Sequence, residues 1–173
     1  LKNKAGAQNW CLLIASYIFY GITDLKMLPI LLTATIVFYI LGILIRRSNS
    51  KKASFFTALG VIAGVGMLVY FKYLNFFIDS FETLFISLGL NVNITTLNIV
   101  FPLGISFFTF RLISYLIEIN RGKIEPTKDF IAFATYIAFF PTLLAGPIDR
   151  PNDFLPQLKS ARVFDYNLAM DGT

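Results

Sequence analysis

One charged side chain within an apolar segment, and a second directly after it, are the residues best suited to chemistry. The segment Ile99 to Ile117 is apolar except for Arg111, and Glu118 follows it directly. In a helix, residues seven apart lie on one face, about 10 Å apart along the axis, with Ser114 and Tyr115 on the same side. A charge inside a membrane span costs about 2.5–3.5 kcal/mol, so it indicates a polar cavity or a partner. We predict that Arg111 faces such a cavity.

Glu118 also has a simpler interpretation. It lies where the apolar segment meets the basic connection 121–128, and Arg121 is three residues further on. That spacing is typical of an ion pair on a helix surface. We favour this pair at the membrane surface over a position in the cavity. Lys72, near the end of an earlier apolar segment, is expected to extend its amine to the interface.

A second candidate feature is the apolar run FFPTLLAGPIDRPNDFLPQL at 139–158, which contains helix-breaking residues. These are Pro141, Gly146 and Pro147. Backbone groups that such residues free from helical bonding are tolerated in a bilayer only where protein or a water-filled cavity covers them. The run should therefore line a cavity, with Gly146 and Pro147 shaping its wall. Asp149 and Arg150 at its mouth could hold a partner or, as exposed charges more often do, simply each other.

The composition indicates that the elements carrying these residues lie in a lipid bilayer. Of the 173 residues, 56% are hydrophobic and only 14% are charged, with a mean hydropathy of +0.68. Soluble domains carry about 25% charged residues. We predict a single all-α membrane domain over residues 1–173, a polytopic bundle with spans at about 10–22, 27–45, 53–71 and 99–117. A further apolar segment at 130–144 is short, and either crosses or re-enters the membrane.

The basic residues alternate between the predicted connections, and this predicts the topology. They occur before the first span, at 46–52 and at 121–128, whereas 79–98 contains acids and no base. By the positive-inside rule, the N-terminus and the two basic connections are cytoplasmic and 79–98 is outside. Because bases follow the helix breakers again at 150–162, we favour re-entry of 130–144 over a full crossing. The net charge of +5 is thus explained without a nucleic-acid partner.

Two further patterns concern how the helices are arranged. The stretch DSFETLFISLGL at 79–90 places four apolar residues on one face, which predicts an amphipathic helix on the outer membrane surface. Asp79 and Glu82 are spaced like a capping box at its start. The same face could instead pack on the bundle. Gly60 and Gly64, four apart, could let a neighbouring helix approach closely, although we slightly favour no special role.

Several ordered motifs together resemble one family. They are LLIASYIFYGITDLKM at 12–27, YFKYLNFF at 70–77, PLGISFFTF at 102–110, ISYLIEINRGKIEP at 113–126, FIAFATYIAFFP at 130–141 and LLAGPIDRPNDFLPQL at 143–158. This series is similar to the membrane-bound O-acyltransferases, in the bacterial branch that acetylates exopolysaccharides such as alginate or D-alanylates teichoic acids. The likeness covers nearly the whole chain. A single AGPI motif would be weak, but the ordered set is specific.

The resemblance implies a many-helix core pierced by a tunnel, with an acyl donor on one side of the membrane and a hydroxyl acceptor on the other. It also implies a histidine that serves as the general base, a role suited to a group that titrates near neutral pH. The chain contains no histidine. Because it opens with Leu1 and ends soon after a new apolar pattern begins, we expect an N-terminal portion, with the histidine beyond Thr173. We assign no catalytic residue within the chain.

Arg111 stands where many members of the family carry glutamine, so no family role transfers to it. A guanidinium there could bind an anionic donor or a sugar carboxylate, or it could pair with a carboxylate from a helix outside the chain. The candidates for a substrate tunnel are therefore Arg111, Ser114, Tyr115, Glu118, Pro141, Gly146, Pro147 and Arg150. With one cysteine, no histidine and scattered carboxylates, no metal site is predicted.

The predicted function is transfer of an acetyl or similar short acyl group to hydroxyls of a cell-surface polysaccharide. D-alanyl transfer to teichoic acid is the alternative within the family, and a transporter, a channel or an inactive scaffold are alternatives outside it. No bound cofactor is expected; acyl-CoA or a carrier-protein thioester would be a substrate. The expected partners are membrane lipid, the donor carrier, the polysaccharide acceptor and an extracellular or periplasmic protein. We expect a multi-pass protein of the cytoplasmic membrane.

Overall fold

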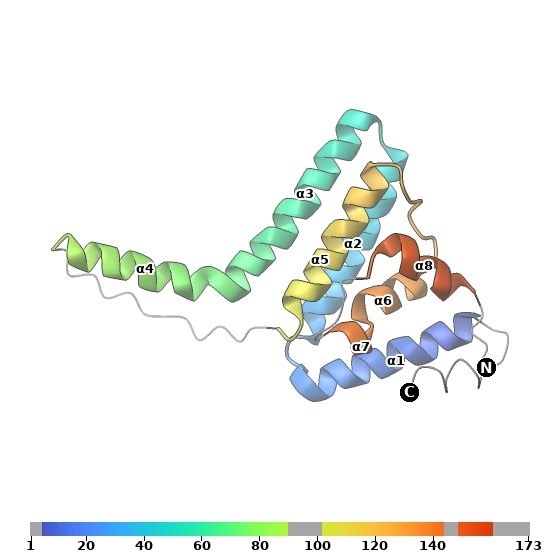
Figure 1. Ribbon diagram of the computed structural model, residues 1–173, viewed down its shortest axis with the longest axis horizontal. Helices are drawn as coiled ribbons and strands as arrows, with labels where there is room; N and C mark the ends of the chain where they lie inside the picture. Colours follow the sequence, from blue (N-terminus) through green and yellow to red (C-terminus); the bar gives the residue numbers. More distant parts are fainter. Residues whose placement is uncertain (1–4, 90–101, 144–148, 161–173) are drawn as a thin grey trace.

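The computed structural model describes residues 5–89, 102–143 and 149–160, which are helical and contain no strand (Figure 1). The elements are α1 (Ala5–Asp24), α2 (Leu28–Arg47), α3 (Ser50–Leu68), the π-helical segment η1 (Val69–Tyr73), α4 (Leu74–Ser87), α5 (Ile105–Asn120), α6 (Phe130–Ala138), α7 (Phe140–Leu143) and α8 (Pro151–Lys159). The predicted all-α fold is confirmed.

Two helices in the described ranges are long and apolar enough to cross a bilayer: α2 and the continuous helix from Ser50 to Ser87. They contain the predicted spans 27–45 and 53–71. Pro29 lies in the first turn of α2, where its missing N–H removes no helical bond, and Arg46 and Arg47 lie in its last turn. The predicted spans 10–22 and 99–117 correspond to α1 and α5, of which α5 begins only at Ile105. Their crossing of the membrane stays a prediction.

Small residues let α3 pack closely against α5. A Cβ atom placed on Gly60 would overlap Cδ1 of Leu116, and one placed on Gly64 would lie 2.9 Å from Cδ1 of Ile113. Both are closer than van der Waals contact, so each glycine admits a side chain of α5 against the α3 backbone. The close approach that we considered the less favoured interpretation is confirmed.

The helix that begins at Ser50 does not stop where the sequence predicted. It continues through η1 into α4, and Figure 1 shows α4 as an arm that extends away from the other helices. The predicted capping box is wrong, because Asp79 lies inside α4 and its carbonyl accepts a hydrogen bond from Oγ1 of Thr83 at 2.8 Å. No proline or glycine occurs between Met67 and Leu88 to end the helix earlier.

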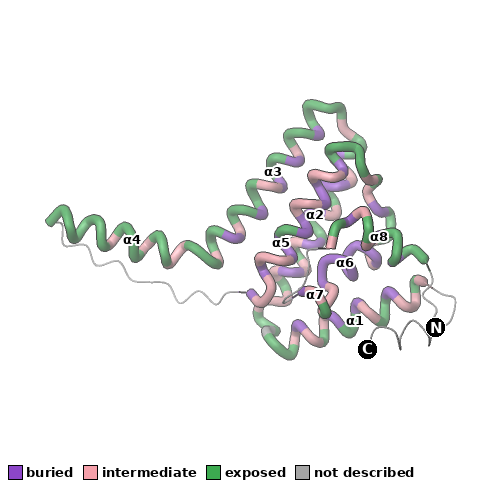
Figure 2. The backbone as a smooth tube through the Cα atoms, in the orientation of Figure 1, coloured by how far each residue is buried: buried purple, intermediate pink, exposed green. Residues whose placement is uncertain are grey.

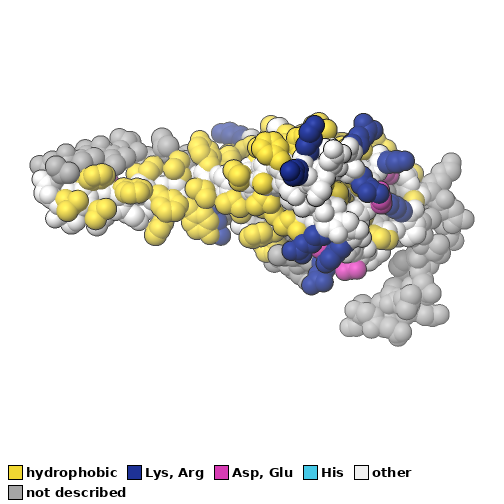
Figure 3. Space-filling model, turned by 90° about the horizontal axis from the view of Figure 1, so that it is seen from above, with side chains coloured by type: hydrophobic (Ala, Val, Ile, Leu, Met, Phe, Trp, Pro, Cys, Tyr) yellow, Lys and Arg dark blue, Asp and Glu magenta, His cyan; other side chains and the backbone are white. Residues whose placement is uncertain are grey.

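The apolar face of α4 is left open. None of its residues is buried, and four apolar side chains that the sequence placed on one face are all exposed: Phe81, Leu84, Phe85 and Leu88 (Figure 2). Hydrophobic side chains run along the whole arm in the view of Figure 3, whereas Lys and Arg side chains gather over the helical body. The arm therefore does not pack on the described bundle, which agrees with the predicted surface helix. Lys72, in η1, is exposed, with its Nζ 5.5 Å from the centre of the Tyr73 ring.

A second group of helices packs beside α2, α3 and α5. Helix α1 lies across the lower part of the molecule in Figure 1 and packs against α6, which also contacts α8 and α2. From Ala132 to Ala138 every residue of α6 is buried. Polar groups join α1 to this group: Nδ2 of Asn9 donates to the carbonyl of Leu158 at 2.9 Å, and Oγ1 of Thr135 donates to the carbonyl of Asn9 at 3.3 Å. Helix α6, which is too short to span a bilayer, is thus enclosed by protein.

The glycine contact predicts the effect of a matched pair of substitutions. A Cβ on Gly64 would meet Ile113, whereas one on Gly66 has no atom within 4 Å. We expect Gly64→Leu to lower the free energy of unfolding by about 1–3 kcal/mol through overpacking. Gly66→Leu should leave stability unchanged or raise it, because leucine favours helix over glycine. The thermal unfolding midpoints of the two purified full-length variants in detergent test this; equal midpoints would contradict the contact.

Candidate functional site: a buried arginine at a broken helix

Helix α6 is capped firmly at its start and broken at its end. The side chain of Asp129 accepts hydrogen bonds from the backbone N–H groups of Ile131 and Ala132, at 2.9 and 3.1 Å. The helix ends at Ala138; the ψ of its C-cap Phe139, 104°, is not helical, and α7 starts at the next residue. The cause is Pro141: it has no N–H to donate to the carbonyl four residues earlier, and its ring would clash with that carbonyl. The break leaves carbonyl groups of the last turn of α6 without helical partners.

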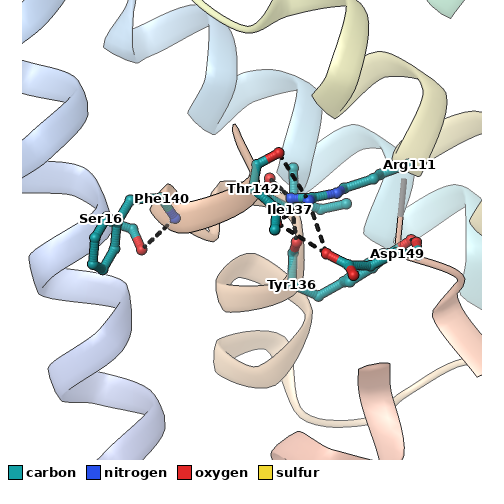
Figure 4. A network of polar contacts seen from close by, with 7 residues as sticks. All are labelled: Ser16, Arg111, Tyr136, Ile137, Phe140, Thr142 and Asp149. Atoms are coloured by element: carbon teal, nitrogen blue, oxygen red, sulfur yellow. Dashed lines mark hydrogen bonds and ion pairs between the residues drawn. The ribbon is translucent and has the colours of Figure 1, made fainter. Parts of the chain in front are cut away.

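Arg111 supplies the missing donors. Its Nη1 donates to the carbonyls of Tyr136 and Ile137, at 3.2 and 3.4 Å, and its Nη2 donates to the carbonyl of Thr142 at 3.2 Å (Figure 4). In an unbroken helix, the N–H of residue 140 would bond to the carbonyl of Tyr136, whereas the carbonyl of Ile137 would face position 141, where proline has no N–H. The guanidinium therefore replaces the backbone bonds that Pro141 prevents.

The N–H of Phe140, also released by the break, is bonded from the other side. It donates to Oγ of Ser16 on α1 at 3.4 Å, and this hydroxyl in turn donates to the carbonyl of Leu12 at 2.8 Å. The two helices α1 and α5 thus hold the break between them, as Figure 4 shows. Sequence reasoning did not single out Ser16; a serine within an otherwise apolar segment was its only signal.

Asp149 neutralises the buried guanidinium. Its Oδ2 lies 3.0 Å from Nη2 of Arg111 and accepts a hydrogen bond from Oγ1 of Thr142 at 2.9 Å. The hydroxyl of Tyr136 donates to the carbonyl of Asp149 at 3.1 Å. Arg111 also contacts the Thr142 hydroxyl, and its side chain is only 1% exposed. A carboxylate partner for Arg111 is thus supplied by this chain, 38 residues later.

The expected pairing of Asp149 with Arg150 is wrong. Asp149 turns toward Arg111, while Arg150 is exposed and makes no ion pair with any residue in the described ranges. Burial explains the choice, because a guanidinium without water gains more from a carboxylate than an exposed one does. Pro141 is exposed in α7. Gly146 and Pro147 lie outside the described residues.

Two further candidates, Ser114 and Tyr115, lie on α5 one turn C-terminal to Arg111. The hydroxyl of Tyr115 accepts a hydrogen bond from the N–H of Thr127 at 3.2 Å, and its ring packs 4.6 Å from that of Phe133, centre to centre. Tyr115 therefore holds the α5–α6 connection. Ser114 is half-buried beside it on the same helix. Whether either residue lines a substrate passage stays a prediction.

Glu118 has different partners from the one predicted. Its Oε1 lies 3.6 Å from Nζ of Lys123, and its Oε2 accepts a hydrogen bond from Nδ2 of Asn152 at 3.1 Å. The predicted ion pair with Arg121 is wrong: Arg121, the C-cap of α5, is exposed, and the Glu118 carboxylate is taken by Lys123 and Asn152. The glutamate instead links the end of α5 to the start of α8.

These contacts show the path, relative to α5, of the broken segment, by which we mean the chain from α6 to the start of α8. The segment starts beside the C-terminal end of α5, reaches Leu143 next to Gly104 at the N-terminal end, and is back at the C-terminal end at Asn152. A Cβ on Gly104, whose φ is +67°, would lie 2.6 Å from the carbonyl oxygen of Leu143, so only glycine allows this contact. The segment thus leaves and returns to the same end of α5.

The described residues contain no group of three or more His, Cys, Asp and Glu side chains that could hold a metal ion. What the site can do is structural and electrostatic: it keeps an irregular backbone and an ion pair together in an apolar environment. A buried ion pair of this kind defines one arrangement of the chain, because separating its members leaves an uncompensated charge.

Comparisons with known proteins place the chain among bacterial acyltransferases. The probable alginate O-acetylase AlgI of Pseudomonas syringae pv. tomato is 39% identical over 155 residues, which are 88% of this chain and 30% of that protein. The peptidoglycan O-acetyltransferase of Helicobacter pylori is 32% identical over 184 residues, 91% of this chain and 34% of that protein. The chain thus spans about a third of the length of the curated relatives it matches.

A shorter similarity joins the chain to the teichoic acid D-alanyltransferase of Lacticaseibacillus rhamnosus. The two are 42% identical over 53 residues, which are 31% of this chain and 13% of that protein. No family model matches the chain, and neither does any solved structure.

The Arg111 cluster predicts strong coupling between two distant substitutions. Arg111→Met should lower the free energy of unfolding by about 3–5 kcal/mol, because it leaves a half-buried carboxylate and several carbonyls without this donor. Asp149→Asn should cost less, and the double variant should be less destabilised than the sum by at least about 1 kcal/mol. Thermal unfolding of the full-length protein in detergent measures all three. Arg121→Met, at an exposed arginine, is the control. Additive effects of Arg111→Met and Asp149→Asn would contradict the ion pair.

The path of the broken segment predicts the sidedness of two exposed positions. Single cysteines replacing Glu125, before α6, and Lys159, at the end of α8, should react with a membrane-impermeant maleimide from the same side of the membrane. A cysteine replacing Leu88, at the end of the α4 arm, should react from the opposite side. The native Cys11 is replaced by serine in all three. Labelling of positions 125 and 159 from opposite sides would show that the segment crosses.

Proposed function

Because the chain belongs to the membrane-bound O-acyltransferase family, we propose that it forms part of an enzyme that transfers an acetyl or similar short acyl group to hydroxyls of a cell-surface polysaccharide. The observation that carries this proposal is the similarity to alginate and peptidoglycan O-acetylating proteins over about nine-tenths of the chain. D-alanyl transfer has less support, since that similarity covers 31% of the chain.

In this proposal, the chain supplies a wall of the reaction chamber. Acyl transfer to a hydroxyl needs a passage for a polar acceptor through an apolar protein, and irregular backbone is tolerated at such depth only when its polar groups are bonded. Arg111 and Ser16 bond the groups freed at the break in α6, so a re-entrant segment can line the chamber without facing lipid. This favours the acyltransferase over the transporter alternative only together with the family similarity.

The acid–base group of the reaction lies outside this chain in the proposal. An acceptor hydroxyl has to lose its proton as it attacks the acyl carbonyl, and a base that titrates near neutral pH suits that step. The chain contains no histidine, and the family resemblance places this residue in a later helix of the enzyme. The residues of this chain hold the framework, and none of them is assigned to proton transfer.

The direction of transfer follows from the charges. The C-terminal end of α2, the start of α3 and the α5–α6 connection carry the basic residues, which supports a cytoplasmic position for this end and for the N-terminus in the cytoplasmic membrane. The acyl donor, acyl-CoA or a carrier-protein thioester, would arrive there. The polysaccharide acceptor, or a periplasmic or extracellular partner that passes the acyl group on, would be on the other side.

An acyl-transfer assay of the full-length protein in liposomes tests this function. With a radiolabelled acetyl donor inside the vesicles and a polysaccharide outside, we expect label to appear in alkali-labile esters of the polysaccharide. Replacement of the histidine downstream of this chain by alanine should reduce the rate by at least about 100-fold. Unchanged turnover in that variant would remove the mechanism. Transfer of D-alanine to teichoic acid, without acetyl transfer, would select the alternative.

A further inference from the structure

Two cavities of opposite character share a wall on α8. The polar cavity, of about 260 Å³, is lined by Asp149, Arg150, Asp153, Phe154 and Gln157. The apolar cavity, of about 440 Å³, lies between α1 and α8 and is lined by Leu12, Phe139, Phe154, Gln157, Leu158 and Ser160. Phe154 and Gln157 belong to both. The larger cavity is within the size range of small-molecule sites.

The polar cavity is lined by two opposite charges, neither of which forms an ion pair within the described part of the chain. Asp149 is already bonded to Arg111 and Thr142, so it adds little free charge. Arg150 and Asp153 are both exposed, and neither forms an ion pair with a described residue, although they are only three residues apart. A ligand that satisfies both must itself carry an anionic and a cationic group. A purely anionic headgroup would meet the Asp153 carboxylate.

The apolar cavity has a floor of aromatic rings. Phe154 packs 4.9 Å from Phe139 and 5.7 Å from Tyr136, ring centre to ring centre. Leu12 on α1 forms the facing wall, and the hydrogen bond of Asn9 to the carbonyl of Leu158 joins the two helices beside it. A hydrocarbon chain there would gain about 0.8 kcal/mol for each methylene group removed from water.

We propose that this pair of cavities binds a phospholipid whose headgroup carries a phosphate and a primary ammonium. The Arg150 guanidinium binds the phosphate, because its planar donors match phosphate oxygens. The Asp153 carboxylate accepts hydrogen bonds from the ammonium, and one acyl chain occupies the space between α1 and α8. The lipid would then act as a structural ligand of the enzyme, separate from the acyl donor and from the acceptor.

Binding of short-chain lipids to the purified full-length protein tests the proposal. Dioctanoyl phosphatidylethanolamine should bind about three- to tenfold more tightly than dioctanoyl phosphatidylglycerol, which has the phosphate without the ammonium. Glycerophosphoethanolamine, the same headgroup without acyl chains, should bind more weakly than either. Equal affinity for the two lipids would overturn the proposal, and so would equal binding of the headgroup alone.

Two variants assign the headgroup contacts. Arg150→Gln should weaken both lipids, because both carry the phosphate. Asp153→Asn should remove the preference for phosphatidylethanolamine and leave phosphatidylglycerol bound as well or better. Arg47→Gln and Asp79→Asn, at exposed charges far along the chain, are the matched controls and should change neither affinity. A preference that survives Asp153→Asn would overturn the assignment. Because binding alone is measured, failure here leaves the proposed acyl transfer unaffected.

Discussion

The bonds between the Arg111 guanidinium and the broken end of α6 are the constraint on which the arrangement of this chain depends. Pro141 makes a continuous helix impossible, and an apolar environment makes unbonded carbonyls expensive. One planar cation with several N–H groups satisfies two carbonyls of the last turn of α6 and a third beyond the break. The ion pair with Asp149 then makes burial of that cation tolerable.

This cluster also links the two groups of helices. Arg111 belongs to α5, which packs with α2 and α3 through glycine contacts, whereas the carbonyls that it bonds belong to the group of α1, α6, α7 and α8. Further polar bonds lie toward the C-terminal end of α5: Tyr115 with Thr127, and Glu118 with Asn152. Because each of these bonds is directional, the two groups have one relative position, where apolar packing alone would allow sliding.

The α4 arm contrasts with this body. Its helix is continuous with α3, yet it buries no residue, and its aromatic side chains are exposed along its length. An apolar surface of this kind is stable where lipid covers it, which fits the predicted position at the outer membrane surface. Internal hydrogen bonds thus fix the arrangement of the helical body, whereas the position of the arm depends on the lipid that covers it.

The sequence by itself determined the class of fold, the helices at 27–45 and 53–71, the family, and the presence of a break near Pro141, because apolar length, charge placement and proline act locally. It also predicted that Arg111 would face a polar cavity, whereas in the structure its guanidinium is buried against carbonyls and a carboxylate of the same chain. Only the tertiary structure decided the partners: Asp149 pairs with Arg111 rather than Arg150, and Glu118 with Lys123 and Asn152 rather than Arg121. Such pairings depend on which chain segments meet in space, and residues 38 apart carry no periodic signal of their meeting. The close contact of Gly60 and Gly64 was likewise decided by the position of α5.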